Sequence, residues 1–238
     1  MTSSTPIVSE KTLWQESVEK NGFAIIPEVL KADEVATLCK SLTALELPRS
    51  RAGIRHLLRN PVVTQAANDI RLLGIARSAL SDDAFPFRAT LFDKSPDSNW
   101  LITWHQDTAL PLQEKHETRG WGSWSIKDGI YYAHAPAVVL EKVLALRLHL
   151  DDSTEKNGPL RVLPGTHKKG VLLDSEVEEV VPSTMPVSCV VNRGGIIVMR
   201  PLVIHASSKS NSEIPRRVLH IEYATQIAVQ SPLRLAIA

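Results

Sequence analysis

The sequence is poor in cysteine and aromatic residues, and neither sign of charge is in excess. Its two cysteines, Cys39 and Cys189, are too few for a secreted disulfide framework or an all-thiolate zinc site. The 27 Lys and Arg stand against 26 Asp and Glu, a net charge of +1. This balance gives no electrostatic reason to expect nucleic acid or an anionic membrane as partner. The 5% aromatic content selects no particular class of small molecule.

Long hydrophobic runs and targeting signals are also missing. Apolar runs such as 196–199 are far shorter than the roughly 20 residues that cross a bilayer. The N-terminus has no basic segment before an apolar core, and the C-terminal Leu-Ala-Ile-Ala matches no sorting address. We therefore expect a cytoplasmic protein without a membrane partner. The length of 238 residues fits a single domain over 1–238, with residues 1–8 disordered.

The hydrophobic pattern divides the chain into a helical first third and a strand-rich remainder. Helices are expected at 12–20, at 32–45 and, as one or two helices, within 61–80, with a buried strand at 23–26. Short β-prone runs separated by turn residues then follow, at 87–92, 101–105, 143–150, 160–163, 187–191, 195–199 and 217–223. This spacing predicts a mainly β barrel or two-sheet roll with an N-terminal helical layer. Segments 108–131 and 168–186 are expected to be long loops.

A histidine and an aspartate stand two residues apart at the end of an apolar strand. In Trp104-His105-Gln106-Asp107, alternation along the strand points His105 and Asp107 to the same face, where both can bind one ion. Imidazole with carboxylate suits Fe(II), Mn(II) or Zn(II). This spacing often arises by chance in a chain with eight histidines, so the motif needs support from elsewhere.

His205 supplies that support, together with the residues that follow it. It ends the apolar stretch 201–204, and the small residues after it leave room for an ion, although a lone histidine there reads better as a core residue. Two histidines and one aspartate leave three octahedral positions open, as in non-haem Fe(II) oxygenases. A 2-oxoacid can take two of these positions and O2 the third. Its far carboxylate then needs a guanidinium, and strand alternation turns only one of Arg216 and Arg217 inward.

The order of these segments is similar to that of a known family. The matching segments are His105-x-Asp107, the run Asn-Gly-Pro-Leu-Arg-Val-Leu-Pro-Gly-Thr-His at 157–167, His205-x-Ser207, Arg216 and the opening at 21–27. Together they resemble the phytanoyl-CoA dioxygenase family of Fe(II)- and 2-oxoglutarate-dependent oxygenases, over roughly residues 20 to 225. The resemblance implies a double-stranded β-helix core, the jelly roll of cupin-like proteins.

The resemblance also implies roles for individual residues. His105, Asp107 and His205 become the iron ligands. Arg216 becomes the residue that binds the C5 carboxylate of 2-oxoglutarate, with Ser207 as its hydroxyl partner and Arg217 as the alternative if the register shifts by one. Related halogenases carry a small residue at the position of Asp107, so its presence favours hydroxylation or another oxidation.

The function that follows is an iron-dependent dioxygenase that uses O2 and 2-oxoglutarate to hydroxylate an unidentified small-molecule metabolite. Two alternatives stay open. The same three side chains could hold Zn(II) in a hydrolase that activates a metal-bound water, although a pair such as Ser207 and Arg216 argues against it. A metal-binding roll without turnover could also act as a sensor or interaction module.

Several further side chains near these strands are expected to line a pocket or to be structural. Arg147 and His149 share one face of their strand, which points either inward or outward. The loop 121–124, with two tryptophans, is either a mobile lid or a buried anchor. The residues that could line the pocket are Arg88, Lys94, Asn99, Trp104, Arg147 and His149. No role is assigned to His56, His116, His134 or His220.

Overall fold

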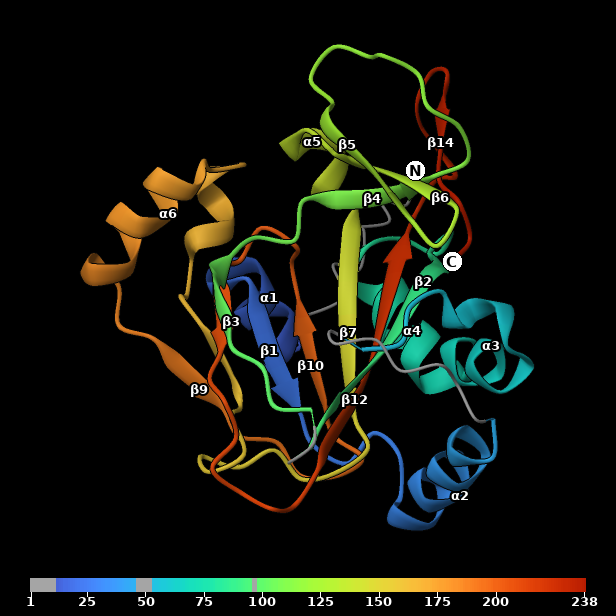
Figure 1. Cartoon of the computed structure of the whole chain (residues 1–238), viewed down its shortest axis with the longest axis vertical. Coiled ribbons are helices and arrows are strands. Elements are labelled where there is room, and N and C mark those ends of the chain that lie inside the picture. Colours follow the sequence, from blue (N-terminus) through green and yellow to red (C-terminus); the bar gives the residue numbers. More distant parts are fainter. Residues whose placement is uncertain (1–11, 46–52, 96–97) are drawn as a thin grey trace, which may run out of the picture.

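The N-terminal part of the chain forms a layer of helices. The computed structural model (Figure 1) describes residues 12–45, 53–95 and 98–238, so the expectation for residues 1–8 lies outside the described residues. The helices of this layer are α1 (Leu13–Asn21), α2 (Ala32–Thr43), η1 (Leu57–Arg59), α3 (Pro61–Ala67) and α4 (Ile70–Ala79). The segment predicted as one or two helices is two, because the Asn60 and Asp69 side chains each accept a bond from a first-turn amide.

Two antiparallel sheets form the jelly roll expected from the sequence. The larger has the strand order β1-β10-β7-β12-β2 and the smaller β3-β11-β8-β9. The strands of the larger sheet are β1 (Phe23–Ile26), β10 (Ile196–Met199), β7 (Val143–His149), β12 (Arg216–Ala224) and β2 (Phe85–Lys94). Those of the smaller are β3 (Ile102–His105), β11 (His205–Ser207), β8 (Leu160–Val162) and β9 (Val187–Cys189).

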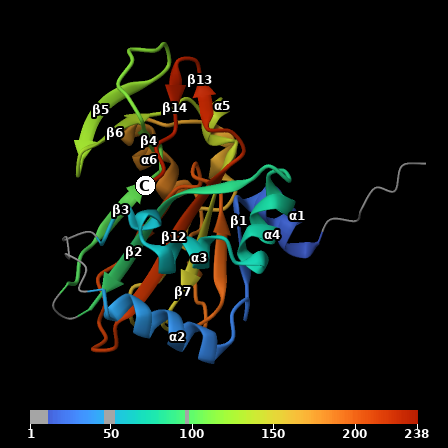
Figure 2. The ribbon, with the colours of Figure 1, turned by 90° about the vertical axis from the view of Figure 1, so that its right-hand side faces the viewer.

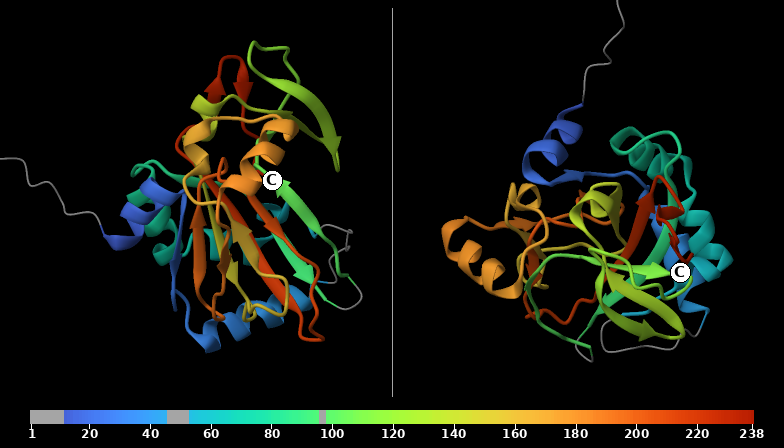
Figure 3. Two further views of the ribbon diagram at one scale, coloured as in Figure 1. Left: turned by 90° about the vertical axis from the view of Figure 1, so that its left-hand side faces the viewer. Right: turned by 90° about the horizontal axis from the view of Figure 1, so that it is seen from above.

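The helical layer covers one face of the larger sheet, as Figures 2 and 3 show. Alternate residues of β7 and β12, such as Leu146, Leu148 and Ile221, belong to one buried cluster with Val35 of α2 and Leu72 of α4. The opposite face looks into the roll. At the β1–β10 end that interior is apolar, with a second cluster formed by Phe23, Ala145, Leu160, Val162, Cys189, Val191, Ile197, Met199 and Val203.

The two segments expected to be long loops contain regular structure, which corrects that prediction. Segment 108–131 holds β4 (Ala109–Leu112), β5 (Gly122–Lys127) and the start of β6 (Ile130–His134), which pair in the order β4-β6-β5. Segment 168–186 holds α6 (Asp174–Val180), between η2 (Thr166–Lys169) and η3 (Val181–Ser183).

Segment 108–131 was predicted to be a loop because the residues that pack against the β4–β6 sheet are distant in the sequence. Leu110, Leu112 and Trp121 are buried in a cluster with Leu233 and Leu235, near the C-terminus. The remaining elements are α5 (Ala137–Leu140), β13 (Ala228–Gln230) and β14 (Leu233–Arg234). No helix in the described parts of the chain has the length and apolarity to cross a membrane.

Candidate metal centre and the adjoining pockets

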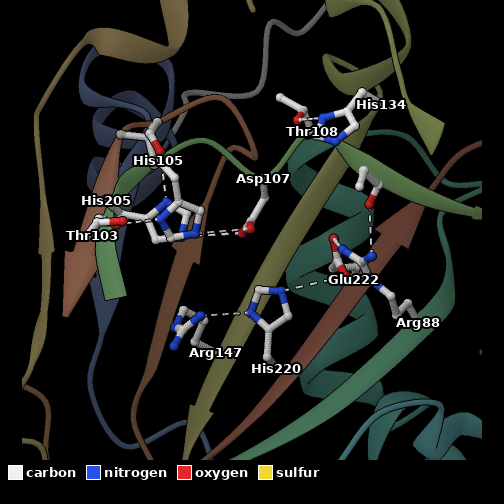
Figure 4. Close-up of polar contacts among 12 residues, drawn as sticks. Arg88, Thr103, His105, Asp107, Thr108, His134, Arg147, His205, His220 and Glu222 are labelled. Carbon is white, nitrogen blue, oxygen red and sulfur yellow. Dashed lines mark hydrogen bonds and ion pairs between the residues drawn. The ribbon is translucent and has the colours of Figure 1, made fainter. Parts of the chain in front are cut away.

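The predicted ligands His105, Asp107 and His205 lie together between the two sheets (Figure 4). His105 on β3 and His205 on β11 are direct partners in the antiparallel ladder, and their ring centroids are 4.3 Å apart. Oxygens of Asp107 lie 3.7 Å from Nε2 of His105 and 3.5 Å from Nε2 of His205. The three ligand atoms all fall within 4.8 Å of one another. Ligand atoms that share one ion are roughly 3 Å apart, so this spacing fits a single ion after a small contraction.

Backbone carbonyls orient both imidazoles. Nδ1 of His105 lies 2.8 Å from the carbonyl oxygen of Thr103, and Nδ1 of His205 lies 2.9 Å from that of Val203. A carbonyl only accepts, so each Nδ1 carries the proton and each Nε2 presents its lone pair to the shared centre. Burial lowers the pKa of His205 to about 4, which keeps its ring neutral at neutral pH. Both rings therefore have the tautomer that binds a metal.

Asp107 supplies the negative charge of the cluster. Burial by itself would raise its pKa, but the neighbouring His205 and His105 outweigh burial and hold the pKa well below its usual range. Between the two ligands, Gln106 points to the other side and donates to the carbonyls of Gly170 and Leu202. The strand end that carries both ligands is thereby fixed to two loops.

A second group of polar side chains lies deeper in the roll and is cationic. The register places Lys94 of β2 directly opposite Arg216 of β12. Nζ of Lys94 donates to Oγ of Ser207 over 2.9 Å, and Nη2 of Arg216 lies 3.4 Å from the same oxygen. Arg147 and His149 of β7 also face inward, and both are buried. We call these five residues, Lys94, Arg147, His149, Ser207 and Arg216, the inner cluster.

The inner cluster has buried donors that lack a partner. Nη1 of Arg216, Nε of Arg147 and both ring nitrogens of His149 bond to none of the described residues. Burial, and then Arg147, lower the pKa of Arg216 to about 10, so the guanidinium stays charged at neutral pH. Burial, with Arg147 and Arg216, lowers the pKa of His149 to about 3. Buried cations with free donors are costly unless an anion binds them, so the cluster fits a carboxylate ligand.

The Asn157-Gly158 turn fixes the geometry of the inner cluster. Nε of Arg216 donates to the Asn157 carbonyl over 3.2 Å, and Ser207 Oγ donates to the Gly158 carbonyl over 2.9 Å. Gly158 has φ +66°, and a Cβ there would lie 2.3 Å from the carbonyl oxygen of Ser208. Only glycine permits this approach. The turn that carries the family resemblance thus acts by orienting Arg216 and Ser207.

On the other side of the candidate ligands opens a cavity of about 440 Å³, which we call the outer pocket. His105 and Asp107 line it together with Arg55, Arg88, Thr90, Phe92, Trp100, Leu101, Ile102, Thr103, Lys127, Tyr132, His220 and Glu222. Arg88 donates to both carboxylate oxygens of Glu222, which is 1% exposed. Burial would raise the pKa of Glu222, but Arg88 outweighs it and keeps the carboxylate ionised.

A row of polar contacts joins the inner cluster to the outer pocket (Figure 4). Nη1 of Arg147 donates to Nδ1 of His220 over 3.1 Å. The Nε2 of His220 therefore carries the ring proton, and it faces Glu222 at 3.7 Å. Glu222 in turn binds Arg88. These residues lie in adjacent rows of the β2–β12–β7 register, so the sheet itself builds the connection.

Of the other residues predicted to line the pocket, some do so and others face away from it. Arg88 lines the outer pocket, whereas Arg217, the alternative to Arg216, faces away and binds Asp151 through two side-chain bonds of 2.8 Å. Two expectations need correction. Trp104 packs with an apolar cluster under α6, and Arg161 stacks over its ring at 5.1 Å, because strand alternation turns it away from His105. Asn99 exchanges two bonds with Ser210 and so fixes a loop.

The two tryptophans near position 122 serve as anchors of the β4–β6 sheet. Trp121 is 7% exposed, and its Nε1 donates to Gln230 over 2.8 Å. Trp124 packs against the same cluster, with Nζ of Lys115 5.8 Å from the centre of its ring. Of the two readings of this loop, the arrangement favours the buried anchor over the mobile lid.

Reasoning from the sequence missed most of the outer pocket. His220 received no role, and Glu222, Tyr132, Arg55 and Lys127 were not considered. For His220 and Glu222 a signal was present, since both lie at even spacing from Arg216 on one strand and so share its inward face. No local signal could have found Arg55 or Lys127, which reach the pocket through distant chain segments.

Comparison with known proteins shows the family of the chain. The model of the family described as phytanoyl-CoA dioxygenase (PhyH) matches residues 18–218. Among curated proteins, an ectoine dioxygenase of Stutzerimonas stutzeri is 26% identical over 179 residues, 68% of this chain and 51% of the relative. An L-proline trans-4-hydroxylase of Streptomyces griseoviridis is 27% identical over 178 residues, 64% of this chain and 59% of the relative. The chain spans about half the length of the first two ectoine dioxygenases that it matches.

Solved structures share the fold. EctD from S. alaskensis, solved with 2-oxoglutarate and 5-hydroxyectoine, superposes with a TM-score of 0.69 at 19% identity, covering 94% of this chain and 79% of that one. AviO1 from Streptomyces viridochromogenes gives 0.66 at 22% identity, with 89% and 93% covered. The chain belongs to the phytanoyl-CoA dioxygenase family.

Proposed function

We propose that the protein is an Fe(II)- and 2-oxoglutarate-dependent dioxygenase that hydroxylates a small molecule. The observation that carries this proposal is the position of two imidazoles and one carboxylate beside a buried cationic cluster with unused donors. The first set suits a ferrous ion with open coordination positions, and the second suits a dicarboxylate that chelates the same ion. The relatives named as ectoine dioxygenase and proline hydroxylase support a small metabolite as substrate.

In this proposal His105, Asp107 and His205 hold the iron. Bound iron would supply activation of O2 and oxidation of a substrate C–H bond, with 2-oxoglutarate as co-substrate. The backbone carbonyls of Thr103 and Val203 keep both rings in the metal-binding tautomer. The carboxylate of Asp107 would offset part of the positive charge of a bound ion. Its presence also supports oxygenation over halogenation.

The inner cluster binds the co-substrate. Arg216, with its free Nη1, would bind the C5 carboxylate, and Ser207 would join it by turning its hydroxyl away from the Gly158 carbonyl; Lys94 adds a second positive charge at the same oxygen of Ser207. Arg147, whose Nε is also free, lies on the neighbouring strand and adds positive charge on the side of His220. These buried donors orient the oxoacid and exclude water from the site.

A zinc hydrolase would need the same three ligands and nothing more. It would leave Arg216, Lys94 and Arg147 buried without a partner for their charge, which is why the inner cluster favours an oxoacid-dependent enzyme. A sensor without turnover would bind iron and the oxoacid but would produce no succinate. The cytoplasmic location expected from the sequence stays a prediction.

The test is anaerobic addition of Fe(II) and 2-oxoglutarate to the purified protein, followed by exposure to O2 with a panel of metabolites. We expect a weak visible charge-transfer band before O2 and succinate release after it. His105→Ala should lose both signals. His116→Ala is the matched control, because His116 lies in an exposed loop and its side chain pairs with Glu114. A protein that hydrolyses esters with Zn(II) and shows no band would contradict the proposal.

A further inference from the structure

The outer pocket holds more positive than negative side-chain charge. Its cations are Arg55, Arg88 and Lys127, and its carboxylates are Asp107 and Glu222. Arg88 already pairs with Glu222 through two donors, and Asp107 belongs to the candidate metal centre. Neither Arg55 nor Lys127 forms an ion pair with any carboxylate among the described residues that line the pocket. Arg55 and Lys127 therefore remain available to bind a molecule that enters the pocket.

Tyr132 lies beside two of these cations, Lys127 and Arg88. Its ring is 2% exposed, and its hydroxyl is 2.9 Å from Nε2 of His56. Nζ of Lys127 lies 4.7 Å from the ring centre, and Cζ of Arg88 lies 5.7 Å from it. An aromatic face attracts a cation but does not neutralise it. Burial, and then repulsion from Arg55 and Arg88, lower the pKa of Lys127, as expected where like charges are held close.

One side of the pocket is apolar, although Thr90, Thr103 and His220 also line it. Phe92 on β2 and the side chains of Trp100, Leu101 and Ile102 before and on β3 supply this surface, beside His105. These side chains can contact a hydrocarbon or ring but cannot bind a charge. The pocket thus combines unpaired cations with an apolar wall next to the candidate metal centre, and its volume of about 440 Å³ suits a small molecule.

We propose that the substrate is a small amphiphilic anion, whose carboxylate or phosphate group binds Arg55 and Lys127 and whose apolar part lies against Phe92, Trp100 and Ile102. This inference rests on the proposed function, because it places the substrate beside the metal. Arg88 is fixed by Glu222, and the ion pair that they form is a polar part of the pocket lining without net charge. A cationic substrate would meet uncompensated positive charge, and a neutral one would leave it unused.

Binding to the outer pocket can be measured apart from binding to the inner cluster. The protein is first saturated with Fe(II) and 2-oxoglutarate without O2, so that the inner cluster is occupied. Phenylacetate, phenylacetamide and phenethylammonium, which share one ring and differ in charge, are then titrated by calorimetry. Benzyl phosphate forms a separate arm that distinguishes a phosphate group from a carboxylate.

We expect the better of the two anions to bind roughly tenfold or more tightly than the amide, and the cation to bind most weakly. Arg55→Gln and Lys127→Gln should each remove most of that preference. Arg119→Gln and Lys142→Gln remove the same charges from exposed positions outside the pocket and should leave it unchanged.

Two failures are distinguishable. If the ferrous–oxoacid band never forms, the proposed function is wrong. If the band forms but the amide or the cation binds as well as both anions, the inference about the substrate is wrong while the enzyme class stands. The same holds if neither anion binds measurably, or if the two pocket variants behave like the two control variants. Succinate release from carboxylates or phosphates, in preference to their amides, would be the matching result in turnover.

Discussion

The two faces of the five-stranded sheet carry opposite chemistry on the same strands. On β12, Leu219 and Ile221 face the helices and are fully buried among apolar side chains. On the same strand, Arg216, His220 and Glu222 face into the roll and are almost as deeply buried. Burial of an apolar side chain is favourable in itself, whereas burial of a charge costs free energy unless a partner compensates it.

This difference between the two faces indicates which residues stabilise the fold and which are available to bind ligands. The face of the sheet that packs against the helices, which we call the outer face, stabilises the fold through that contact. The face that looks into the roll, the inner face, carries both the inner cluster and the β12 residues of the outer pocket. The inner face contains charges that the fold alone does not satisfy, since Arg147, His149 and Arg216 retain free donors within the described structure. A change on the outer face should therefore lower stability and leave ligand binding intact. A change on the inner face should weaken ligand binding and leave the stability of the fold nearly unchanged.

The largest effect is expected at the candidate metal ligand that faces this inner surface. His205→Ala removes one of three ligands, so metal affinity and activity should fall by more than the roughly 10- to 100-fold typical of changes to groups that only orient a ligand. Thermal unfolding without metal should change little, because the ring contacts the Val203 carbonyl and the other two candidate ligands, Asp107 and His105. Iron binding by absorbance and unfolding by circular dichroism measure the two effects. A stable variant that still binds iron normally would refute the assignment of this ligand.

On the outer face, Leu146→Ala should destabilise without disturbing chemistry. Leu146 is fully buried in the helix-facing cluster, and truncating such a side chain costs about 3 kcal/mol of the free energy of unfolding. Denaturant titration measures the loss. Leu173→Ala, which truncates a leucine that is 70% exposed, is the control and should have little effect. A large fall in oxoacid affinity at an intact fold would mean that the two faces are not independent.

The alternation that separates the faces was readable in the sequence, and so was much of the site. Runs such as 143–150 and 217–223 predicted strands, and the spacing of His105 and Asp107 predicted a shared face. The union of these two residues with His205 rested on family resemblance, because no local rule states which strands will pair. The ladder that places His205 opposite His105 joins residues a hundred positions apart.

What could not be predicted depended on distant contacts. The β4–β6 sheet looked like a loop because its buried residues pack against Leu233 and Leu235, near the other end of the chain. Trp104 was expected in the pocket because it lies on the strand that carries His105, whereas alternation next to His105 turns its side chain away. Lys94 was considered only for the pocket mouth, and its place opposite Arg216 follows from the β2–β12 register.

A sharper contrast comes from the two adjacent arginines at the start of β12. Arg216→Gln removes a buried charge with a free donor, so affinity for 2-oxoglutarate should fall roughly 10- to 100-fold while iron still binds. Arg217→Gln removes a charge that pairs with Asp151 on the other face, and should cost only some stability. The ferrous–oxoacid band, titrated with 2-oxoglutarate, gives both affinities. Equal losses in the two variants would show that the inward side chain is assigned wrongly.

The smallest effect is a pH dependence that arises at Lys94. Burial, and then the charges of Arg216 and Arg147, lower the pKa of Lys94 to about 7 when no anion is bound. A carboxylate beside Nζ favours the charged form and raises this pKa, so above pH 7 binding of 2-oxoglutarate takes up a proton. Affinity should then be constant below about pH 7 and weaken above it, by at most about tenfold per pH unit. Calorimetry in two buffers of different ionisation enthalpy measures the proton uptake directly. Lys94→Gln should bind more weakly at about pH 7 but lose the uptake and flatten the profile. An unchanged slope in that variant would assign the proton to another group.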